Sequence, residues 1–283
     1  MADDRFTNET NASLKIALVN EIITGPPADF MLGKSGIYDD QRRIKMLDNA
    51  TGVGNLLMRF LEQMRKRHRH LDADQVIGAD TDARYVEWLD ARAKQQGYRV
   101  QSLQLDQQDT GLEPDAFTHV FNNFGVFFAP KESAALRDTL RLLQDGGLAF
   151  FSSWQKISWW YEVVISAMER YLPDAPALPD PLDLFRKLGW TEGQSTEQKL
   201  RNAGFTAVGS EVYSSTPQID AQSFAAAAAV LFKAVTGKTW DAESREKYES
   251  LIEAALYKHL ISTWNDGRWT GEVSALVTWG RKS

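Results

Sequence analysis

The stretch from Ile44 to Gly54, with the sequence IKMLDNATGVG, constrains this chain most. It predicts an apolar strand that ends in an acid, then a turn of small residues and a helix beginning at Asn55. Glycines let a backbone pass close to a bound group, and the free N–H groups of a helix start can bind an anion. The stretch therefore predicts a nucleotide-type cofactor at the end of a parallel sheet. An ordinary strand, turn and helix with two glycines is the alternative interpretation.

The spacing of the small residues restricts the kind of cofactor. A dinucleotide fingerprint requires a third small residue at the position where Leu57 stands. A phosphate-binding P-loop requires Gly-Lys-Ser/Thr, and this tripeptide does not follow the turn. The stretch instead contains an acid followed by small residues at alternate positions.

The pattern Asp48-x-Ala50-x-Gly52-x-Gly54 resembles the first motif of the class I S-adenosylmethionine-dependent methyltransferases. Its form LDNATGVG is similar to the LDNACG form that is common in fungal small-molecule methyltransferases. Ala50 replaces the first glycine of the family pattern, and Thr51 replaces the usual cysteine. The resemblance implies that S-adenosylmethionine is bound by Asp48, Asn49, Ala50, Gly52 and Gly54.

A second apolar run, VIGA, ends in Asp80 one helix after the glycine turn. The two oxygens of a carboxylate at such a strand end match the vicinal hydroxyls of a ribose. We therefore expect Asp80, with Thr81 beside it, to contact the cofactor ribose. The alternative is that Asp80 is a plain turn or cap residue. Asp82 is expected to cap the next helix and Gly97 to end it.

Two further strand ends carry predicted cofactor contacts. In the resembling family an acid followed by a polar residue after the third strand recognises adenine, which implies this role for Asp106 and Gln107. A polar loop is the alternative. The fourth strand leads into Asn123 and Phe124, and in the family this point lies under the methionine part of the cofactor.

The alternation of short apolar runs with helical segments predicts an α/β fold with a doubly wound sheet. The resemblance implies seven mostly parallel strands, with the strand at 272–279 inserted antiparallel between the fifth and sixth. We expect an N-terminal helical lid at 1–43 and a methyltransferase domain at 44–283 with cap insertions at about 156–203 and 218–265. Gly25-Pro-Pro27 should end the N-terminal helix. A helix that merely covers one edge of the sheet is the alternative to a lid.

The segment after the fifth strand contains Trp159, Trp160 and Tyr161, followed by several prolines. An aromatic, proline-interrupted insertion can form a substrate lid, so these three residues are candidate acceptor contacts. The alternative is that they pack in a core, as aromatic clusters commonly do.

The catalytic residue is not readable from the sequence. His259, on the apolar stripe of a long helix, is a candidate general base or simply a core histidine, and His119 should lie at the opening end of the fourth strand, away from the site.

Composition limits the remaining possibilities. The 283 residues carry a formal net charge of −6, which argues against a nucleic-acid partner. The basic run RKRHRH at 65–70 is the exception to this negative charge, and we expect it to lie at the exposed C-terminal end of a helix. The chain has no cysteine, which excludes thiolate zinc sites and a cysteine nucleophile. No other metal-binding constellation is visible, so we expect no metal site.

The sequence also predicts where the protein works and with what. Its acidic N-terminus has no apolar signal core and no run is long enough to span a membrane, so we expect a cytoplasmic protein that is a monomer or homodimer. The resemblance implies transfer of a methyl group from S-adenosylmethionine to a small molecule, in secondary metabolism. A cyclase or pericyclase that uses the same fold, or a non-catalytic cofactor-binding regulator, is the alternative.

Overall fold

The chain forms two compact units in a computed structural model that describes residues 9–283. The helical unit comprises residues 9–23, 156–183 and 214–273, and the sheet unit comprises Thr24–Gln155, Leu184–Tyr213 and Ser274–Ser283. The first eight residues of the predicted N-terminal lid lie outside the described residues. Residues 184–203, which the sequence assigned to the first cap insertion, belong to the sheet unit.

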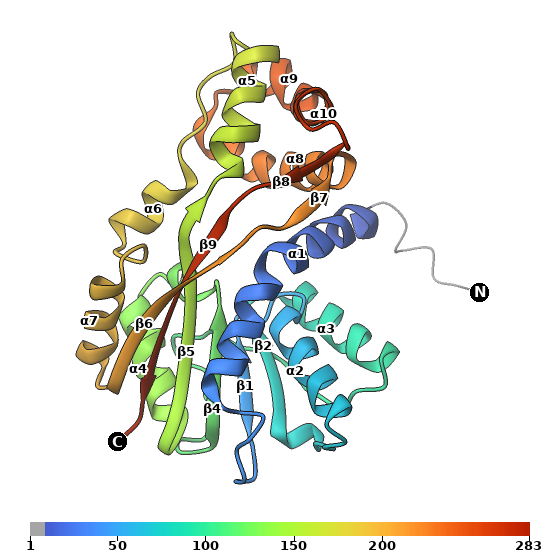
Figure 1. Cartoon of the computed structure of the whole chain (residues 1–283). Helices are drawn as coiled ribbons and strands as arrows, with labels where there is room; N and C mark the ends of the chain where they lie inside the picture. Colours follow the sequence, from blue (N-terminus) through green and yellow to red (C-terminus); the bar gives the residue numbers. More distant parts are fainter. Residues whose placement is uncertain (1–8) are drawn as a thin grey trace. The chain divides into compact units, whose positions relative to one another are not determined.

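The sheet unit contains the predicted seven-stranded sheet (Figure 1), which confirms the expected fold class. The strand β1 pairs in parallel with both β2 and β4, and β9 is the antiparallel strand between β5 and β6. In sheet order the strands are β3 (Gln101–Gln104), β2 (Val76–Asp80), β1 (Met46–Asn49), β4 (Phe117–Asn123), β5 (Leu143–Ile157), β9 (Val273–Arg281) and β6 (Thr206–Ser215).

The order of the strands places the site. The chain moves outward from β1 through β2 to β3, then returns to the other side of β1 at β4. Right-handed crossovers therefore put the first two connecting helices on one face and the next helix on the other. The loops that follow β1 and β4 diverge to opposite faces, and ligands bind in the crevice at such a switch point. The connecting helices are α2 (Asn55–Lys66), α3 (Ala83–Gln95), α4 (Glu132–Leu142) and, before β6, α7 (Gly193–Ala203).

Local sequence signals explain these helices. The helix α2 begins at Asn55, as predicted, and buries an apolar stripe against the sheet. The helix α3 is capped by Asp82, whose side chain accepts a hydrogen bond from Arg84 N. Gly97 follows α3 with a φ of 74°, a left-handed conformation that suits glycine after a helix end. The fully buried core on this face includes Met46, Leu57, Phe60, Leu89, Phe121 and Phe150.

The N-terminal helix α1 (Glu9–Ser35) does not stop where the sequence predicted. It runs through Pro26 and Pro27, and that expectation was wrong. Burial on the sheet stabilises the turns after the prolines and offsets the missing N–H groups. Gly25 also lies close to Arg59, because an added Cβ would come within 2.3 Å of the guanidinium. The buried apolar residues of α1 beyond the prolines are Ala28, Met31 and Leu32.

The basic run at the end of α2 is used in packing. The guanidinium of Arg65 lies 5.0 Å from the ring centroid of Tyr98, and that of Arg67 lies 4.8 Å from the ring of Tyr38. Arg69 Nη1 donates to the Tyr38 carbonyl oxygen at 2.9 Å. Cation–π and hydrogen-bond contacts of this kind support a structural role at the helix end.

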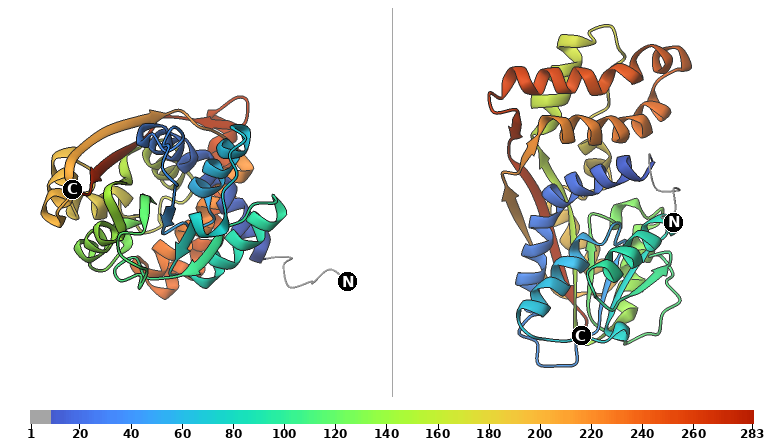
Figure 2. Two further views of the ribbon diagram at one scale, coloured as in Figure 1. Left: turned by 90° about the horizontal axis from the view of Figure 1, so that it is seen from below. Right: turned by 90° about the vertical axis from the view of Figure 1, so that its right-hand side faces the viewer.

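The helical unit is built around the long helix α8 (Ala221–Thr239), which lies beside α10 (Ile252–Thr263), as Figure 2 shows. α10 also packs against α5 (Ser166–Tyr171) and the π-helix η4 (Trp160–Ile165). Within residues 9–283, no helix combines the length and apolar character needed to cross a bilayer. The remaining elements are η2 (Ala73–Gln75), η3 (Val126–Phe128), α6 (Pro181–Lys187), β7 (Gln218–Asp220), α9 (Ala242–Tyr248), η5 (Glu249–Leu251) and β8 (Arg268–Thr270).

Candidate functional site

The loop after β1 adopts a left-handed backbone at three of its small positions. The φ angles of Ala50, Gly52 and Gly54 are 62°, 55° and 80°. Glycine takes this conformation freely, whereas for alanine it costs about 1–2 kcal/mol. The loop is tied to the neighbouring strand because Thr51 N donates to the Ala79 carbonyl oxygen at 2.8 Å. A strained, well-held loop of this kind is typical of a ligand-binding turn.

Asp80 ends β2, and main-chain N–H groups hold its carboxylate. Gly52 N donates to Asp80 Oδ2 at 2.9 Å, and Asp82 N donates to Asp80 Oδ1 at 3.1 Å. Each carboxylate oxygen can still accept another hydrogen bond, so the pair can receive both hydroxyls of a diol. The neighbouring Thr81 is fixed through its carbonyl oxygen, which accepts from Gln104 Nε2 at 3.0 Å.

Asp48 lies beneath the same loop and is 1% exposed. Its Oδ2 accepts from Thr51 Oγ1 at 2.6 Å, so the threonine that replaces the family cysteine serves as a hydrogen-bond donor. Its Oδ1 is buried and has no hydrogen-bond partner among residues 9–283. The pKa of Asp48 is raised to about 7, mainly by burial and in smaller part by the nearby charge of Asp80, while the hydrogen bond from Thr51 acts in the opposite direction.

Gln107 holds the turn that follows β4. Its Oε1 accepts from Asn122 Nδ2 at 2.8 Å, and its Nε2 donates to the Gly125 carbonyl oxygen at 3.1 Å. Gly125 N in turn donates to Asn122 Oδ1 at 3.0 Å. Both ends of the Gln107 amide are therefore engaged, which supports a positioning role. The neighbouring Asp106 accepts from Gln108 N at 2.9 Å, and its predicted adenine contact stays a prediction.

Phe124 is held in an unusual backbone conformation. Its φ is 59°, and its N–H donates to Ser152 Oγ at 2.9 Å. Ser152 Oγ donates to Asn123 Oδ1 at 2.8 Å. The Phe124 ring stacks on Trp154, with the ring centroids 4.1 Å apart. Ser152 and Trp154 were not predicted as site residues from the sequence, although both lie toward the carboxyl end of β5, where ligands bind in such sheets.

The loops after β1 and β4 meet directly. A Cβ added at Gly125 would lie 2.4 Å from the Ala50 Cβ, so only glycine fits there. Thr24 of α1 joins the two loops, because its Oγ1 accepts from Asn55 Nδ2 and its carbonyl oxygen accepts from Asn123 Nδ2. The sheet unit thus brings together at one edge Asp48, Asn49, Ala50, Gly52, Gly54, Asp80, Thr81, Gln107, Asn123 and Phe124.

This edge fits S-adenosylmethionine. Asp80 offers two acceptor oxygens to a ribose diol, and the left-handed turn keeps bulky side chains away from a bound group. The buried Asp48 Oδ1 has an unused acceptor position beneath the loop. A nicotinamide dinucleotide would instead need a third small residue at the position of Leu57, which is buried in the core.

The predicted acceptor residues have different environments in the helical unit. Trp160 is 2% exposed, and its ring centroid lies 5.6 Å from that of Phe232. Trp159 meets Trp160 edge to face at 6.1 Å. Tyr161 is 58% exposed, and its hydroxyl donates to Asp180 Oδ2 at 2.7 Å. Burial favours the packing interpretation for Trp160, whereas Tyr161 is largely exposed.

Both histidines considered from the sequence are buried. His259 Nε2 donates to the Glu162 carbonyl oxygen at 2.9 Å, and its Nδ1 has no partner among the residues described. His119 is the third residue of β4 and pairs with Met46, the first residue of β1, so it lies at the opening end of the strand as predicted. Burial lowers the pKa of His119 to about 4, so this ring is neutral at pH 7.

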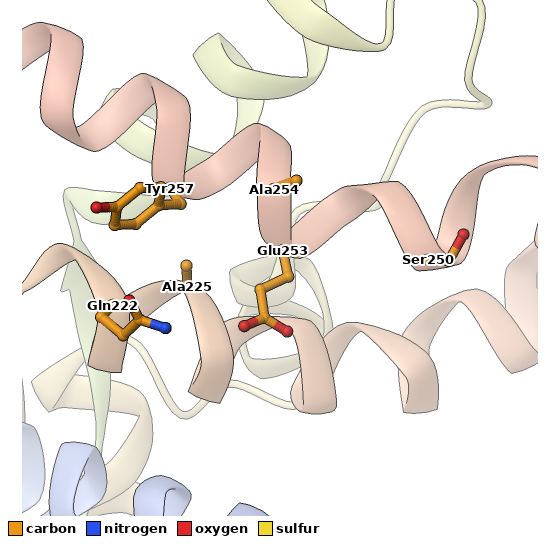
Figure 3. Close-up of a pocket in the computed structure, with 6 residues that line it drawn as sticks. All are labelled: Gln222, Ala225, Ser250, Glu253, Ala254 and Tyr257. Carbon is orange, nitrogen blue, oxygen red and sulfur yellow. The ribbon is translucent and has the colours of Figure 1, made fainter.

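A groove of about 390 Å³ lies between α8 and α10 (Figure 3). None of the predicted site residues lines it, and most of its lining side chains are exposed. In the described part of the chain, no group of three His, Cys, Asp or Glu residues is placed to hold a metal ion. The groove is lined by Gln222, Ala225, Ser250, Glu253, Ala254 and Tyr257.

Comparison with known proteins is consistent with this site. Residues 46–147 match a family model described as a methyltransferase domain. The methyltransferase tpcH of Aspergillus fumigatus is 28% identical over 263 residues, which cover 90% of this chain and 91% of the relative. The acetylaranotin bis-thiomethyltransferase of Aspergillus terreus is 29% identical, over 85% of this chain and 83% of the relative.

A solved structure agrees in fold. The structure of a putative methyltransferase from Bacillus halodurans superimposes with a TM-score of 0.53 at 13% identity, covering 90% of this chain and 98% of that one. At this identity the likeness speaks for the fold alone.

Replacing Asp80 with alanine should weaken binding of S-adenosylmethionine and of its demethylated product. The loss should be about 1–3 kcal/mol, the cost of hydrogen bonds to a charged group. Titration calorimetry measures the loss, with Asp90→Ala on α3 as the control, because the half-exposed Asp90 side chain pairs with Lys94 on the same helix. Unchanged affinity in the Asp80 variant would exclude the ribose contact.

Replacing Asp48 with asparagine should change how stability depends on pH. The pKa of the Asp48 carboxyl is about 7 in the folded protein, above its value in the unfolded chain. The native state therefore binds the proton more tightly, and the stability of the wild type falls as pH rises from about 4 to 7. The variant lacks this decline, and its stability relative to wild type should rise by about 1.4 kcal/mol per pH unit across that window.

Urea unfolding at pH 5 and pH 8 measures this difference. Asp90→Asn should follow the wild-type profile, because Asp90 is on the surface. A difference between Asp48→Asn and wild type that is the same at both pH values would show that Asp48 titrates normally.

Proposed function

We propose that this chain, a class I S-adenosylmethionine-dependent methyltransferase, methylates a small-molecule acceptor of secondary metabolism. The observation that carries the proposal is the meeting of the loops after β1 and β4 beside Asp80, at the edge of the sheet where such folds bind ligands. Similarity to fungal methyltransferases over most of their length supports the class of acceptor. One relative is named a bis-thiomethyltransferase, so sulfur is among the acceptor atoms to test.

The side chains of the protein need not take part in bond making or breaking in this reaction. The bound cofactor supplies a methyl group already activated by the sulfonium. The protein binds it through the loop after β1 and Asp80, excludes water and orients the acceptor. Positioning of this kind can supply about 7–11 kcal/mol of the barrier. A dedicated general base is therefore optional, above all for acceptors that ionise easily.

One segment of the sheet unit is proposed to shape the acceptor site. Thr24 of α1 bonds to both Asn55 and Asn123, which supports the interpretation of the N-terminal segment as a lid that contacts the site. The acceptor role of Trp159, Trp160 and Tyr161 stays a prediction of the sequence. The cytoplasmic location and the monomeric or homodimeric state stay predictions of the sequence.

Incubation with methyl-labelled S-adenosylmethionine and a small-molecule extract tests the proposal. We expect labelled products, with one molecule of demethylated cofactor formed for each methyl group transferred. An acceptor that is converted without demethylated cofactor would instead indicate a cyclase. Cofactor binding without any conversion, across extracts rich in phenols, amines and thiols, would indicate a regulator.

Replacing His259 with alanine should lower the melting temperature and leave turnover within a few fold of wild type. The ring donates to the Glu162 carbonyl oxygen, and removing such a buried partner costs about 1–3 kcal/mol. Thermal melts and turnover of an identified acceptor give the two quantities. A fall of about 100-fold or more in turnover, with fold and cofactor affinity intact, would establish general-base catalysis by this residue.

A further inference from the structure

An apolar patch on the sheet unit is unexplained by packing. Phe128 is 69% exposed and Leu184 is 53% exposed, whereas their neighbours Phe127 and Phe185 are buried. The Phe127 ring lies 4.7 Å from that of Phe128 and 4.6 Å from that of Phe185. Phe127 thus anchors Phe128 and joins it to Phe185, and Leu184 is the residue before Phe185 on α6. We call these four residues the apolar patch.

The patch is fixed to the cofactor edge. Phe128 N donates to the Gly125 carbonyl oxygen at 3.1 Å, and Gln107 Nε2 donates to the same oxygen. Gly125 is the residue that abuts Ala50 of the loop after β1. Phe128 therefore stands one short helical turn, η3, from the point where the two site loops meet.

The exposure of Phe128 has a free-energy consequence. A large aromatic ring in water forgoes about 1.5–3 kcal/mol of burial energy. The ring is nevertheless presented on a short helix whose other aromatic side chain is buried and anchored. An exposed, well-anchored aromatic face next to a binding site suits a planar ligand, because offset-stacked rings gain about 0.5–1.5 kcal/mol beyond their burial.

The position of the patch indicates which ligand binds to it. An acceptor must reach the methyl group of the cofactor, so its binding surface must adjoin the cofactor edge. In the described sheet unit the other large exposed apolar residues are Tyr85 and Val212. Val212 lies on β6, the outermost strand, and Tyr85 lies on α3 after β2, on the ribose side. Phe128 alone among these follows the turn after β4, where the resemblance places the methionine part of the cofactor.

We propose that Phe128 and Leu184 form the contact surface for the acceptor, and that the acceptor is a planar aromatic molecule. The inference rests on the proposed function, because it assumes that methyl transfer takes place at this edge. Phe128 is then a specificity-determining residue. It stacks on the acceptor ring, while Leu184 adds apolar contact area and the cofactor contacts are unaffected.

The test compares a planar probe with its saturated counterpart. Naphthalen-2-ol and decahydronaphthalen-2-ol are titrated by calorimetry into the full-length protein, with and without saturating S-adenosylhomocysteine. Wild type should bind the planar probe more tightly. Phe128→Ala should weaken binding of naphthalen-2-ol by about 2- to 12-fold, the range expected for a lost ring pair.

Matched variants separate stacking from stability. Phe128→Leu keeps an apolar side chain and should weaken the planar probe more than the saturated one. Val212→Ala, at another exposed apolar position, should leave both probes unaffected. All variants should keep the wild-type melting temperature and affinity for S-adenosylhomocysteine.

The outcomes distinguish this inference from the proposed function. Equal binding of both probes, or unchanged binding in Phe128→Ala, would overturn the aromatic acceptor surface even if S-adenosylhomocysteine binds normally. A change in sedimentation of Phe128→Ala without a change in probe affinity would assign the patch to self-association and overturn the inference. Failure of wild type to bind S-adenosylhomocysteine would count against the proposed function, while the titrations without it still decide the role of Phe128.

Discussion

The contact between Gly125 and Ala50 holds the candidate site together. A Cβ at residue 125 would come within 2.4 Å of the Ala50 side chain, so the turn after β4 and the loop after β1 pack too closely for any residue but glycine at this position. Both loops are strained, with left-handed backbones at Ala50 and Phe124. Such strain persists only where the surroundings fix the conformation, and the Gln107 amide does so by bonding both sides of the turn.

Burial separates the roles of aromatic residues that look alike in the sequence. Trp160 is enclosed in the helical unit, where its ring meets Phe232. Phe124 is buried at the cofactor edge and stacks on Trp154, so it shapes the site without being free to move. Phe128, four residues later, is mostly exposed. Only an exposed ring can gain by covering a ligand, and this is why its environment, and not its residue type, points to recognition.

The sequence predicted the fold well where the signals are local. The end of β2 at Asp80, the cap at Asp82 and the start of α2 at Asn55 were all placed correctly. The resemblance supplied the position of the antiparallel strand β9. The predicted end of α1 at its two prolines was wrong, because burial of the following turns outweighed the loss of the proline N–H groups. Propensity is a weak signal against tertiary packing of this kind.

The sequence by itself determined the strands, their glycine turn and the acids that end them, because strand and turn signals depend on residues a few positions apart. Only the tertiary structure decided which side chains hold the site. Gln107 reaches Gly125 across 18 positions, and Phe124 N reaches Ser152 across 28. Hydrogen-bond partners so far apart are set by the order of the strands, since β4 is flanked by β1 and β5. The same holds for the exposure of Phe128, which depends on every element that packs around it.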